Sequence, residues 1–270
     1  MANSKGTALV TGASAGIGTI YADRLAKRGY DLILVARDGK RLTALADRIK
    51  AETGRSAEVF PADLTSKADL AKVTKRLRDD RAVTVLVNNA GMGGNGPLVG
   101  ADMDVTDKII DLNITAVTHL ASAAAANFSA RKSGTIINIA SVLALAPERF
   151  NATYCGSKAY VLNLSLTLNA ELAESGVRIQ AVLPGATKTE IWERAGIDPS
   201  GLPPEMVMDV EPMVDAALSG LDLGELVTIP SLPDVADWEK YNAARLALGP
   251  NLSRNTPAAR YKGVKSPAHV

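Results

Sequence analysis

The sequence predicts a doubly wound α/β fold, in which helices cover both faces of a mostly parallel, seven-stranded sheet. Two observations predict it. Short and almost continuously apolar runs recur along the chain, and longer stretches with helical spacing of apolar residues separate them. Continuous apolar runs are typical of strands covered on both faces, and short strand–helix connections imply right-handed crossovers between parallel strands. We therefore expect a ligand crevice at the carboxyl ends of the strands.

Each element is expected from its own residues. The helix over Ile17–Arg28 places Ile17, Ile20 and Leu25 on one stripe, as an amphipathic helix requires. The expected strands are Thr7–Thr11, Asp31–Ala36, Ala57–Ala62, Val83–Asn88, Thr135–Ala140, Val177–Leu183 and Glu225–Ile229. The other expected helices are Lys40–Thr53, Lys67–Asp80, Asp102–Ala130 and Ala152–Ser175.

The composition excludes several classes of partner. A chain of 270 residues with 47% hydrophobic and 22% charged residues suits a single domain over residues 1–270. Thirty basic and 29 acidic residues leave a net charge of +1, so nothing favours nucleic acid or an anionic membrane as partner. No run reaches the roughly 18 apolar residues of a membrane span. Cys155 and two histidines offer neither an internal disulfide nor a metal-ligand cluster, so we expect a metal-free, cytoplasmic protein.

Two segments depart from the strand–helix pattern. From about residue 190 the apolar pattern loosens and prolines and methionines intervene. We expect a mobile lid over the crevice at about 190–215, the alternative being a surface insertion packed by its methionines. Trp192, Met206 and Met208 either line an apolar substrate pocket or serve that packing. The tail at about 251–270 is either loosely ordered or packed on a partner subunit.

A glycine-rich segment follows the first strand. Thr11–Gly18 reads TGASAGIG and leads directly into a helix. Glycines allow the backbone to turn sharply and to approach a ligand closely, and the free N–H groups and dipole of the helix favour a pyrophosphate. The position between an apolar strand and an amphipathic helix indicates a dinucleotide-binding loop. The alternative is a glycine-rich structural turn.

The end of the second strand indicates which dinucleotide binds. An acidic residue there would bind the adenosine ribose hydroxyls of NAD(H) and repel a phosphate. Here the strand ends in Ala36 and Arg37, with Lys40 and Arg41 close behind. A guanidinium can hold the 2′-phosphate of NADP(H) through paired hydrogen bonds. The cluster favours NADP(H) over NAD(H), although Arg37 taken alone is more typical of a solvated surface charge.

Four polar residues are candidates for catalysis. Tyr154 and Lys158 lie one helical turn apart and so share a face of the expected helix. A free tyrosine, with a pKa of about 10, is a poor acid or base at neutral pH, and a neighbouring lysine cation lowers that pKa. Ser141 ends the fifth strand, where its hydroxyl can bind a substrate carbonyl. Asn113 lies among apolar residues of a long expected helix, which indicates a buried hydrogen-bonding role or a satisfied core amide.

In combination these motifs resemble the short-chain dehydrogenase/reductase family, in its single-domain, Rossmann-type branch, over about residues 5–190. The matching segments are Thr11–Gly18 for the Thr-Gly-x-x-x-Gly-x-Gly motif, Asp63-Leu64 for the adenine contact, Asn88–Gly91 for the Asn-Asn-Ala-Gly turn, Tyr154–Lys158 for the Tyr-x-x-x-Lys motif, and Pro184-Gly185 with Thr189 for the nicotinamide carboxamide.

The resemblance implies a catalytic tetrad of Asn113, Ser141, Tyr154 and Lys158. In that scheme Tyr154 exchanges the proton, Ser141 positions the carbonyl, Lys158 also binds ribose hydroxyls, and Asn113 helps to hold a relay water. The implied cofactor contacts are Gly12, Ser14, Gly16, Ile17, Gly18, Arg37, Asp63, Leu64, Asn89, Ala90, Gly91, Tyr154, Lys158, Pro184, Gly185, Thr187 and Thr189.

The resemblance favours an NADPH-linked carbonyl reductase that converts a ketone or aldehyde to an alcohol. It also implies a homodimer or homotetramer formed through the helices at Asp102–Ala130 and Ala152–Ser175. Leu223–Pro230 lacks the Val-Asp-Gly-Gly signature of ketoacyl reductases, which disfavours a ketoacyl-carrier substrate. The alternatives are an NAD-dependent alcohol dehydrogenase and a non-catalytic NADP(H)-sensing regulator, which has no need of Tyr154 and Lys158. A sugar epimerase or dehydratase fits poorly, because that branch has a longer chain.

Overall fold

Seven parallel strands form one sheet in the order β3-β2-β1-β4-β5-β6-β7. The strands are β1 (Thr7–Thr11), β2 (Asp31–Ala36), β3 (Ala57–Pro61), β4 (Val83–Asn88), β5 (Gly134–Ile139), β6 (Val177–Val182) and β7 (Val227–Thr228). The predicted doubly wound, seven-stranded sheet is confirmed. The seventh strand is shorter than Glu225–Ile229, because only two residues pair with β6.

The computed structural model describes residues 4–196, 198 and 201–261. The chain divides into two units between Pro230 and Ser231. The first unit contains the sheet and every residue that the sequence assigned to a site.

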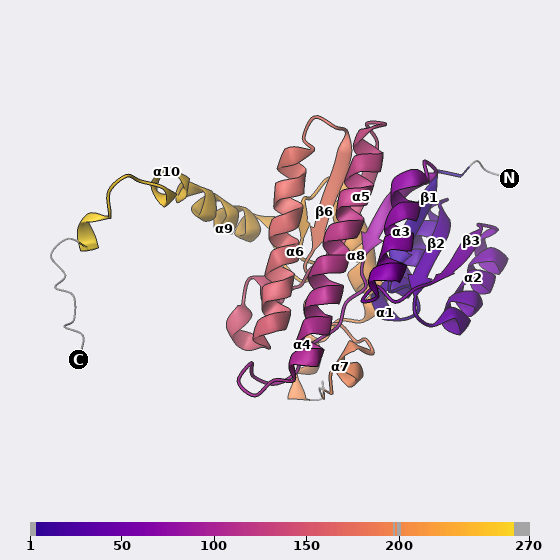
Figure 1. The fold of residues 1–270 in the computed structure, drawn as a ribbon, viewed down its shortest axis with the longest axis horizontal. Coiled ribbons are helices and arrows are strands. Elements are labelled where there is room, and N and C mark those ends of the chain that lie inside the picture. The colour runs from indigo at the N-terminus through magenta and orange to yellow at the C-terminus, as the bar shows by residue number, and fades with distance from the viewer. Residues whose placement is uncertain (1–3, 197, 199–200, 262–270) are drawn as a thin grey trace. The chain divides into compact units, whose positions relative to one another are not determined.

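Helices cover the sheet in two layers (Figure 1). One layer buries apolar side chains of α1, α2 and α8 against one face, and the other buries those of α3, α5 and α6 against the opposite face. These helices are α1 (Gly16–Lys27), α2 (Gly39–Thr53), α3 (Lys67–Asp79), α5 (Val117–Ser129), α6 (Ala152–Glu171) and α8 (Val210–Leu223).

Strand β1 shows why the strands are continuously apolar. Ala8 and Val10 lie in the core on the α1 side of the sheet, whereas Leu9 lies in the core on the other side. All three are fully buried. Successive side chains of a strand point to opposite faces, so a strand covered on both sides requires an apolar residue at every position.

The strand order reverses between β1 and β4. Strands β1 to β3 extend to one edge of the sheet, and β4 to β7 extend to the other. The loops that follow β1 and β4 therefore separate at the centre of the sheet. This is the topological switch point, at which open α/β sheets bind their ligands.

The helix predicted over Asp102–Ala130 is interrupted. A π-helical segment, Asp111–Ala116, separates α4 (Met103–Ile110) from α5 and contains Asn113. Such segments add a residue to one turn and are frequent at functional sites. Residues Met103–Ser129 are long and apolar enough to cross a membrane by length and composition alone. However, α5 contributes to the core beside β5, as the core helix of a soluble protein does.

The segment after β6 is more regular than the sequence suggested. It contains α7 (Ile191–Arg194), a 3-10 turn (Pro204–Met206) and the start of α8. Met213 on α8 is fully buried in the core, while Met206 is 53% exposed. The methionines thus serve core packing only in part, and a lid at about 190–215 stays a prediction.

The second unit consists of short helices. They are α9 (Val235–Ala247), α10 (Gly249–Leu252) and a 3-10 turn (Ala259–Tyr261). None of these helices contains a buried residue. The last part of the expected tail, residues 262–270, lies outside the described residues.

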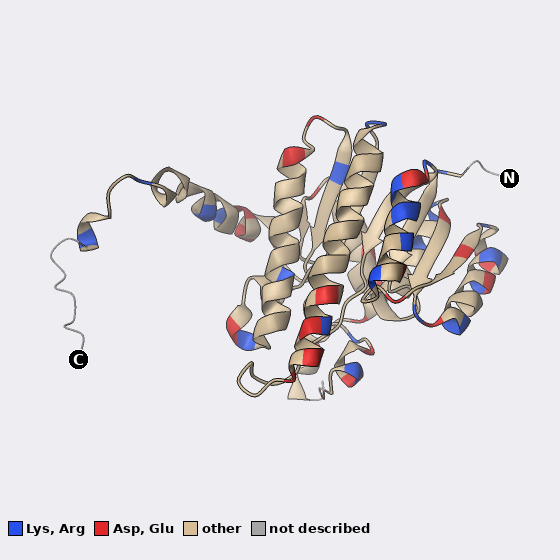
Figure 2. Cartoon of the chain, viewed as in Figure 1, with Lys and Arg blue, Asp and Glu red and all other residues tan. Residues whose placement is uncertain are grey.

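Charge is distributed unevenly among the helices (Figure 2). Helices α2 and α3 carry charged residues along their length. Helix α5 has none, and α6 has only Lys158 and Glu171. Helices α5 and α6 are therefore much less charged than α2 and α3.

Candidate active site

The loop between β1 and α1 is shaped to approach a ligand. Gly12 and Gly16 have φ angles of 65° and 54°, which side-chain-bearing residues rarely adopt. A Cβ on Gly16 would lie 3.2 Å from Thr189 Cγ2, so this loop and the segment after β6 face each other closely. Ala15 provides no side-chain cap for α1, whose first turn lacks acidic residues. The first N–H groups of α1 are therefore suited to an anionic ligand.

A hydrogen-bonded hub joins this loop to the turn after β4. The Thr11 hydroxyl accepts hydrogen bonds from the backbone N–H groups of Asn89 and Ala90, both at 3.0 Å, and donates to the Val87 carbonyl at 3.2 Å. Asn89 Nδ2 donates to the Thr11 carbonyl at 2.9 Å. A Cβ on Gly18 would lie 2.6 Å from the same Nδ2. The two glycine-containing motifs therefore form one packed unit.

The basic residues after β2 have different partners. Arg41 donates through Nη1 to both carboxylate oxygens of Glu190 at 2.9 Å. Arg37 is exposed, and within the described residues its side chain forms no hydrogen bond or ion pair. After β3, the Asp63 carboxylate accepts hydrogen bonds from the backbone and hydroxyl of Thr65. The guanidinium N–H groups of Arg37, unlike those of Arg41, are thus available to bind a ligand at the end of β2.

Asn113 is buried in the π-helical segment and bonds to two other elements. Its Oδ1 accepts from the Met92 N–H at 3.0 Å, and its Nδ2 donates to the Met92 carbonyl at 3.0 Å. Nδ2 also donates to Ser157 Oγ at 3.0 Å. These bonds satisfy the buried amide and tie the turn after β4 to α6. They support both interpretations of Asn113, so its catalytic role stays a prediction.

Tyr154 and Lys158 lie beside Asn113. The Lys158 ammonium lies 5.6 Å from the centre of the Tyr154 ring and donates to the Ile139 carbonyl, at the end of β5, at 3.0 Å. A Cβ on Gly91 would lie 3.2 Å from Asn113 Oδ1 and 3.6 Å from Lys158 Nζ. Asn113 and Lys158 therefore border the turn after β4, at the carboxyl edge of the sheet, and Tyr154 lies beside Lys158.

Burial controls the protonation of this pair. It raises the pKa of Tyr154 to about 12, and a hydrogen bond with Ser141 acts in the opposite direction. It also lowers the pKa of Lys158 to about 8. The lowering of the Tyr154 pKa that the sequence led us to expect is not found, because burial penalises both charged forms. At neutral pH Tyr154 is therefore a phenol that can donate a proton.

The segment after β6 closes the site on another side. Ser141 Oγ donates to the Pro184 carbonyl at 3.5 Å. Thr187 Oγ1 donates to the Gly185 carbonyl at 3.1 Å. The Thr187 carbonyl accepts from Trp192 Nε1 at 2.8 Å. The residues expected to hold the nicotinamide thus border Ser141, and Trp192 is fixed to the same segment.

Sequence reasoning missed two residues beside Tyr154. The Phe150 ring lies edge-to-face with the Tyr154 ring, their centroids 5.5 Å apart. Asn151 caps α6 through Oδ1, which accepts from the Tyr154 N–H at 2.9 Å, and its Nδ2 donates to the Gly96 carbonyl at 2.9 Å. An asparagine at the start of an expected helix is a recognisable N-cap signal. Nothing in the sequence marked Phe150.

Cys155 follows Tyr154 on α6 but belongs to the core. Its side chain is 1% exposed and its thiol is free. Burial raises the pKa of this thiol, which makes it unreactive. Within the described residues, no group of three or more His, Cys, Asp or Glu is placed to hold a metal ion.

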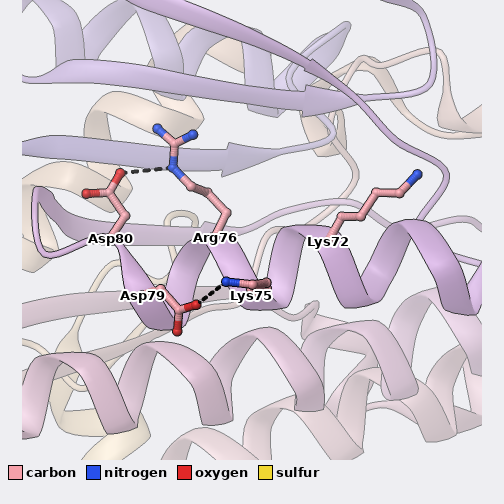
Figure 3. A pocket seen from close by; sticks show the side chains of 5 residues that line it. All are labelled: Lys72, Lys75, Arg76, Asp79 and Asp80. Carbon is pink, nitrogen blue, oxygen red and sulfur yellow. Dashed lines mark hydrogen bonds and ion pairs between the residues drawn. The ribbon is translucent and has the colours of Figure 1, made fainter.

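A surface hollow lies along α3, away from these residues (Figure 3). It is lined by Lys72, Lys75, Arg76, Asp79 and Asp80. Lys75 pairs with Asp79 at 2.6 Å, and Arg76 pairs with Asp80 at 2.9 Å. These are ion pairs of a largely exposed helix surface, which contribute little stability, and none of the candidate site residues lines the hollow.

The sequence matches the family model for short chain dehydrogenases over residues 6–199. An uncharacterised oxidoreductase of Staphylococcus epidermidis is 33% identical over 187 residues, which cover 69% of this chain and 80% of that protein. The match therefore includes the loop after β1, the turn after β4 and the Tyr154–Lys158 pair.

Two solved structures are similar over nearly the whole chain. A short-chain dehydrogenase from Sphingobium yanoikuyae in complex with NADPH has a TM-score of 0.92 and 50% identity, with 95% of this chain and 100% of that chain covered. A bulky-bulky ketone specific alcohol dehydrogenase from Comamonas testosteroni has a TM-score of 0.88 and 45% identity, with 96% and 100% covered. The folds agree beyond the segment that the family model matches.

Proposed function

The chain belongs to the short chain dehydrogenase family and is an oxidoreductase, and from this premise we propose that it reduces a ketone or aldehyde to the alcohol with NADP(H). The observation that carries the proposal is the meeting of Tyr154, Lys158 and Asn113 at the carboxyl edge of the sheet. Two similar structures, an NADPH complex of a short-chain dehydrogenase and a ketone-specific alcohol dehydrogenase, support the cofactor and the reaction class.

The residues present fit NADP(H). Gly12 and Gly16 leave the loop after β1 without side chains at these positions, so that its backbone can approach a pyrophosphate, and the uncapped N-terminus of α1 offers N–H donors. Arg37 offers an uncommitted guanidinium for the 2′-phosphate, where an acid would favour NAD(H). When bound, NADPH supplies the hydride of the reduction.

The chain's own residues supply the proton and hold the carbonyl. Tyr154 donates its phenolic proton to the carbonyl oxygen, which suits a group that is protonated at neutral pH. Ser141 donates a hydrogen bond to the same oxygen. Lys158 stabilises the phenolate that remains, and its bond to the Ile139 carbonyl fixes its position. Asn113 keeps the turn after β4 in place against α6.

Replacing the proton donor tests the mechanism. We expect Tyr154→Phe to lower kcat for ketone reduction by a factor on the order of a hundred to ten thousand, the typical contribution of a general acid. NADPH binding, followed by energy transfer from tryptophan, should be nearly unchanged. Tyr160→Phe is a matched control, because Tyr160 lies on the same helix and pairs with Thr118.

Three results would count against parts of the proposal. Activity retained in Tyr154→Phe would remove the assigned mechanism. Tight NADPH binding by the unaltered protein without turnover of any ketone or aldehyde in a broad panel would favour a cofactor-sensing regulator. A preference for NADH would overturn the role given to Arg37 and would favour an NAD-dependent alcohol dehydrogenase.

The helices α5 and α6 support assembly into a homodimer or homotetramer. Together they carry only two charged residues, Lys158 and Glu171, and Lys158 is buried. Faces between subunits are depleted of charged residues at their centre. The mass of the particle in solution tests this part of the proposal.

A further inference from the structure

Three aromatic rings meet at the proton donor. The Phe150 ring lies at 77° to the Tyr154 ring. Phe150 also lies at 80° to the Trp192 ring, with the centroids 6.5 Å apart. Aromatic residues make up only 4% of the chain, so this grouping is unusual for its composition. Edge-to-face pairs at these distances are favourable beyond the apolar area that they bury.

The rings come from two segments, and hydrogen bonds fix each segment. Trp192, on α7, donates to the Thr187 carbonyl at 2.8 Å. Phe150 immediately precedes Asn151, whose side chain bonds to the backbone of Tyr154 and of Gly96. Rings held by their flanking backbone lose little further freedom when a ligand covers them, and a preorganised wall therefore binds more tightly.

Neither ring belongs to the closed core. Phe150 and Trp192 are both only partly buried, and neither is among the residues that pack the two core clusters. The indole N–H of Trp192 is already satisfied by Thr187. What both rings can offer a ligand is therefore apolar ring surface, that of Phe150 beside Tyr154 and that of Trp192 beside Phe150.

We propose that Phe150 and Trp192 form an aromatic wall that selects ketones carrying an aryl group next to the carbonyl. The inference rests on the proposed function, because a carbonyl that accepts the Tyr154 proton must place a substituent beside the ring that contacts Tyr154. An aryl substituent extends the edge-to-face series, whereas a saturated ring of similar size gains only burial. Each aromatic contact favours the aryl ketone by roughly two- to tenfold.

The test compares two ketones of similar size. For the unaltered enzyme with NADPH, we expect kcat/KM for phenyl methyl ketone to exceed that for cyclohexyl methyl ketone by about tenfold. Phe150→Leu and Trp192→Leu should each reduce this ratio by roughly two- to tenfold. Trp192→Phe should keep most of it. Trp238→Leu, a tryptophan substitution on α9 in the second unit, should leave the ratio unchanged.

A binding measurement separates this inference from the proposed function. With Tyr154→Phe and NADP⁺, 1-phenylethanol should bind more tightly than 1-cyclohexylethanol, and Trp192→Leu added to Tyr154→Phe should reduce the difference. Equal turnover and equal binding of the aryl and saturated compounds would overturn the aromatic wall and leave the ketone reductase standing. An aryl preference in binding without turnover of any ketone would support the wall and count against the reductase.

Discussion

At the scale of single residues, Lys158 is the side chain whose surroundings oppose its charge most clearly. It is 6% exposed, its one hydrogen bond is to the Ile139 carbonyl, and burial lowers its pKa to about 8. No carboxylate pairs with it among the described residues. A buried cation without a counter-charge lowers the free energy of unfolding, and enzymes retain such groups where function requires them.

This cost predicts a pH-dependent stability. The pKa of Lys158 is lower in the folded protein than in the unfolded chain, so between about pH 8 and pH 10.5 the unfolded chain binds more protons. Stability due to Lys158 therefore rises with pH. Relative to Lys158→Met, we expect the unaltered protein, without ligands, to gain about 1 kcal/mol of unfolding free energy from pH 7 to pH 9. Urea unfolding at each pH measures the free energy of unfolding of both proteins. If this free energy depended on pH in the same way in the unaltered protein and in Lys158→Met, the prediction would be wrong.

The polar residues of the site were accessible from the sequence, whereas of its apolar residues only Trp192 was named, either as pocket lining or as packing, and Phe150 was missed. Tyr154, Lys158 and Ser141 stand at recognisable spacings, because proton transfer requires particular atoms at a strand end and on one helix face. Phe150 and Trp192 carry no such pattern. An aromatic residue in a loop is compatible with core, surface or pocket, and only its neighbours in space decide.

At the scale of elements, the start of α6 determines where Tyr154 lies. Asn151 joins that helix to the loop after β4 through its two bonds, to the Tyr154 N–H and the Gly96 carbonyl. The π-helical segment between α4 and α5 positions Asn113, which bonds to Met92 in the turn after β4 and to Ser157 on α6. The sequence predicts both helices from their periodicity, but one residue added to a turn leaves that periodicity almost unchanged, so the π turn could not be predicted.

The cap gives a separable prediction. We expect Asn151→Ala to lower the free energy of unfolding by about 1–2 kcal/mol, because α6 loses its cap and the Gly96 carbonyl loses its donor. Asn151→Ser keeps a capping oxygen and should recover part of that loss. Asn163→Ala, which removes an exposed bond on the same helix, should change it by less than about 0.5 kcal/mol. If Ser were as damaging as Ala, the Gly96 bond would be the one that matters.

At the scale of the whole molecule, the sequence predicted the first unit far better than the second. Strands β1 to β6 were placed to within a residue at each end, because most of them, such as β1 and β2, are buried along nearly their whole length and hence largely apolar. The division after Pro230 was not expected. Helix α9 buries none of its residues, so its apolar residues need not follow the spacing of a helix packed on a core. The sequence alone therefore could not assign this segment to a separate unit.

The single thiol of the chain can report how often α6 separates from the core, because its rate of chemical modification depends on that opening. Cys155 is free, 1% exposed and adjacent to Tyr154, so a thiol reagent can reach it only when α6 comes away from its neighbours. We expect alkylation in native buffer to be slower than in urea by a factor of at least about a thousand, with the rate reporting the opening equilibrium. Fast labelling of the folded protein would contradict this expectation. No engineered label is required, and any substitution or ligand that stabilises α6 can be ranked by how long this one sulfur stays unmodified.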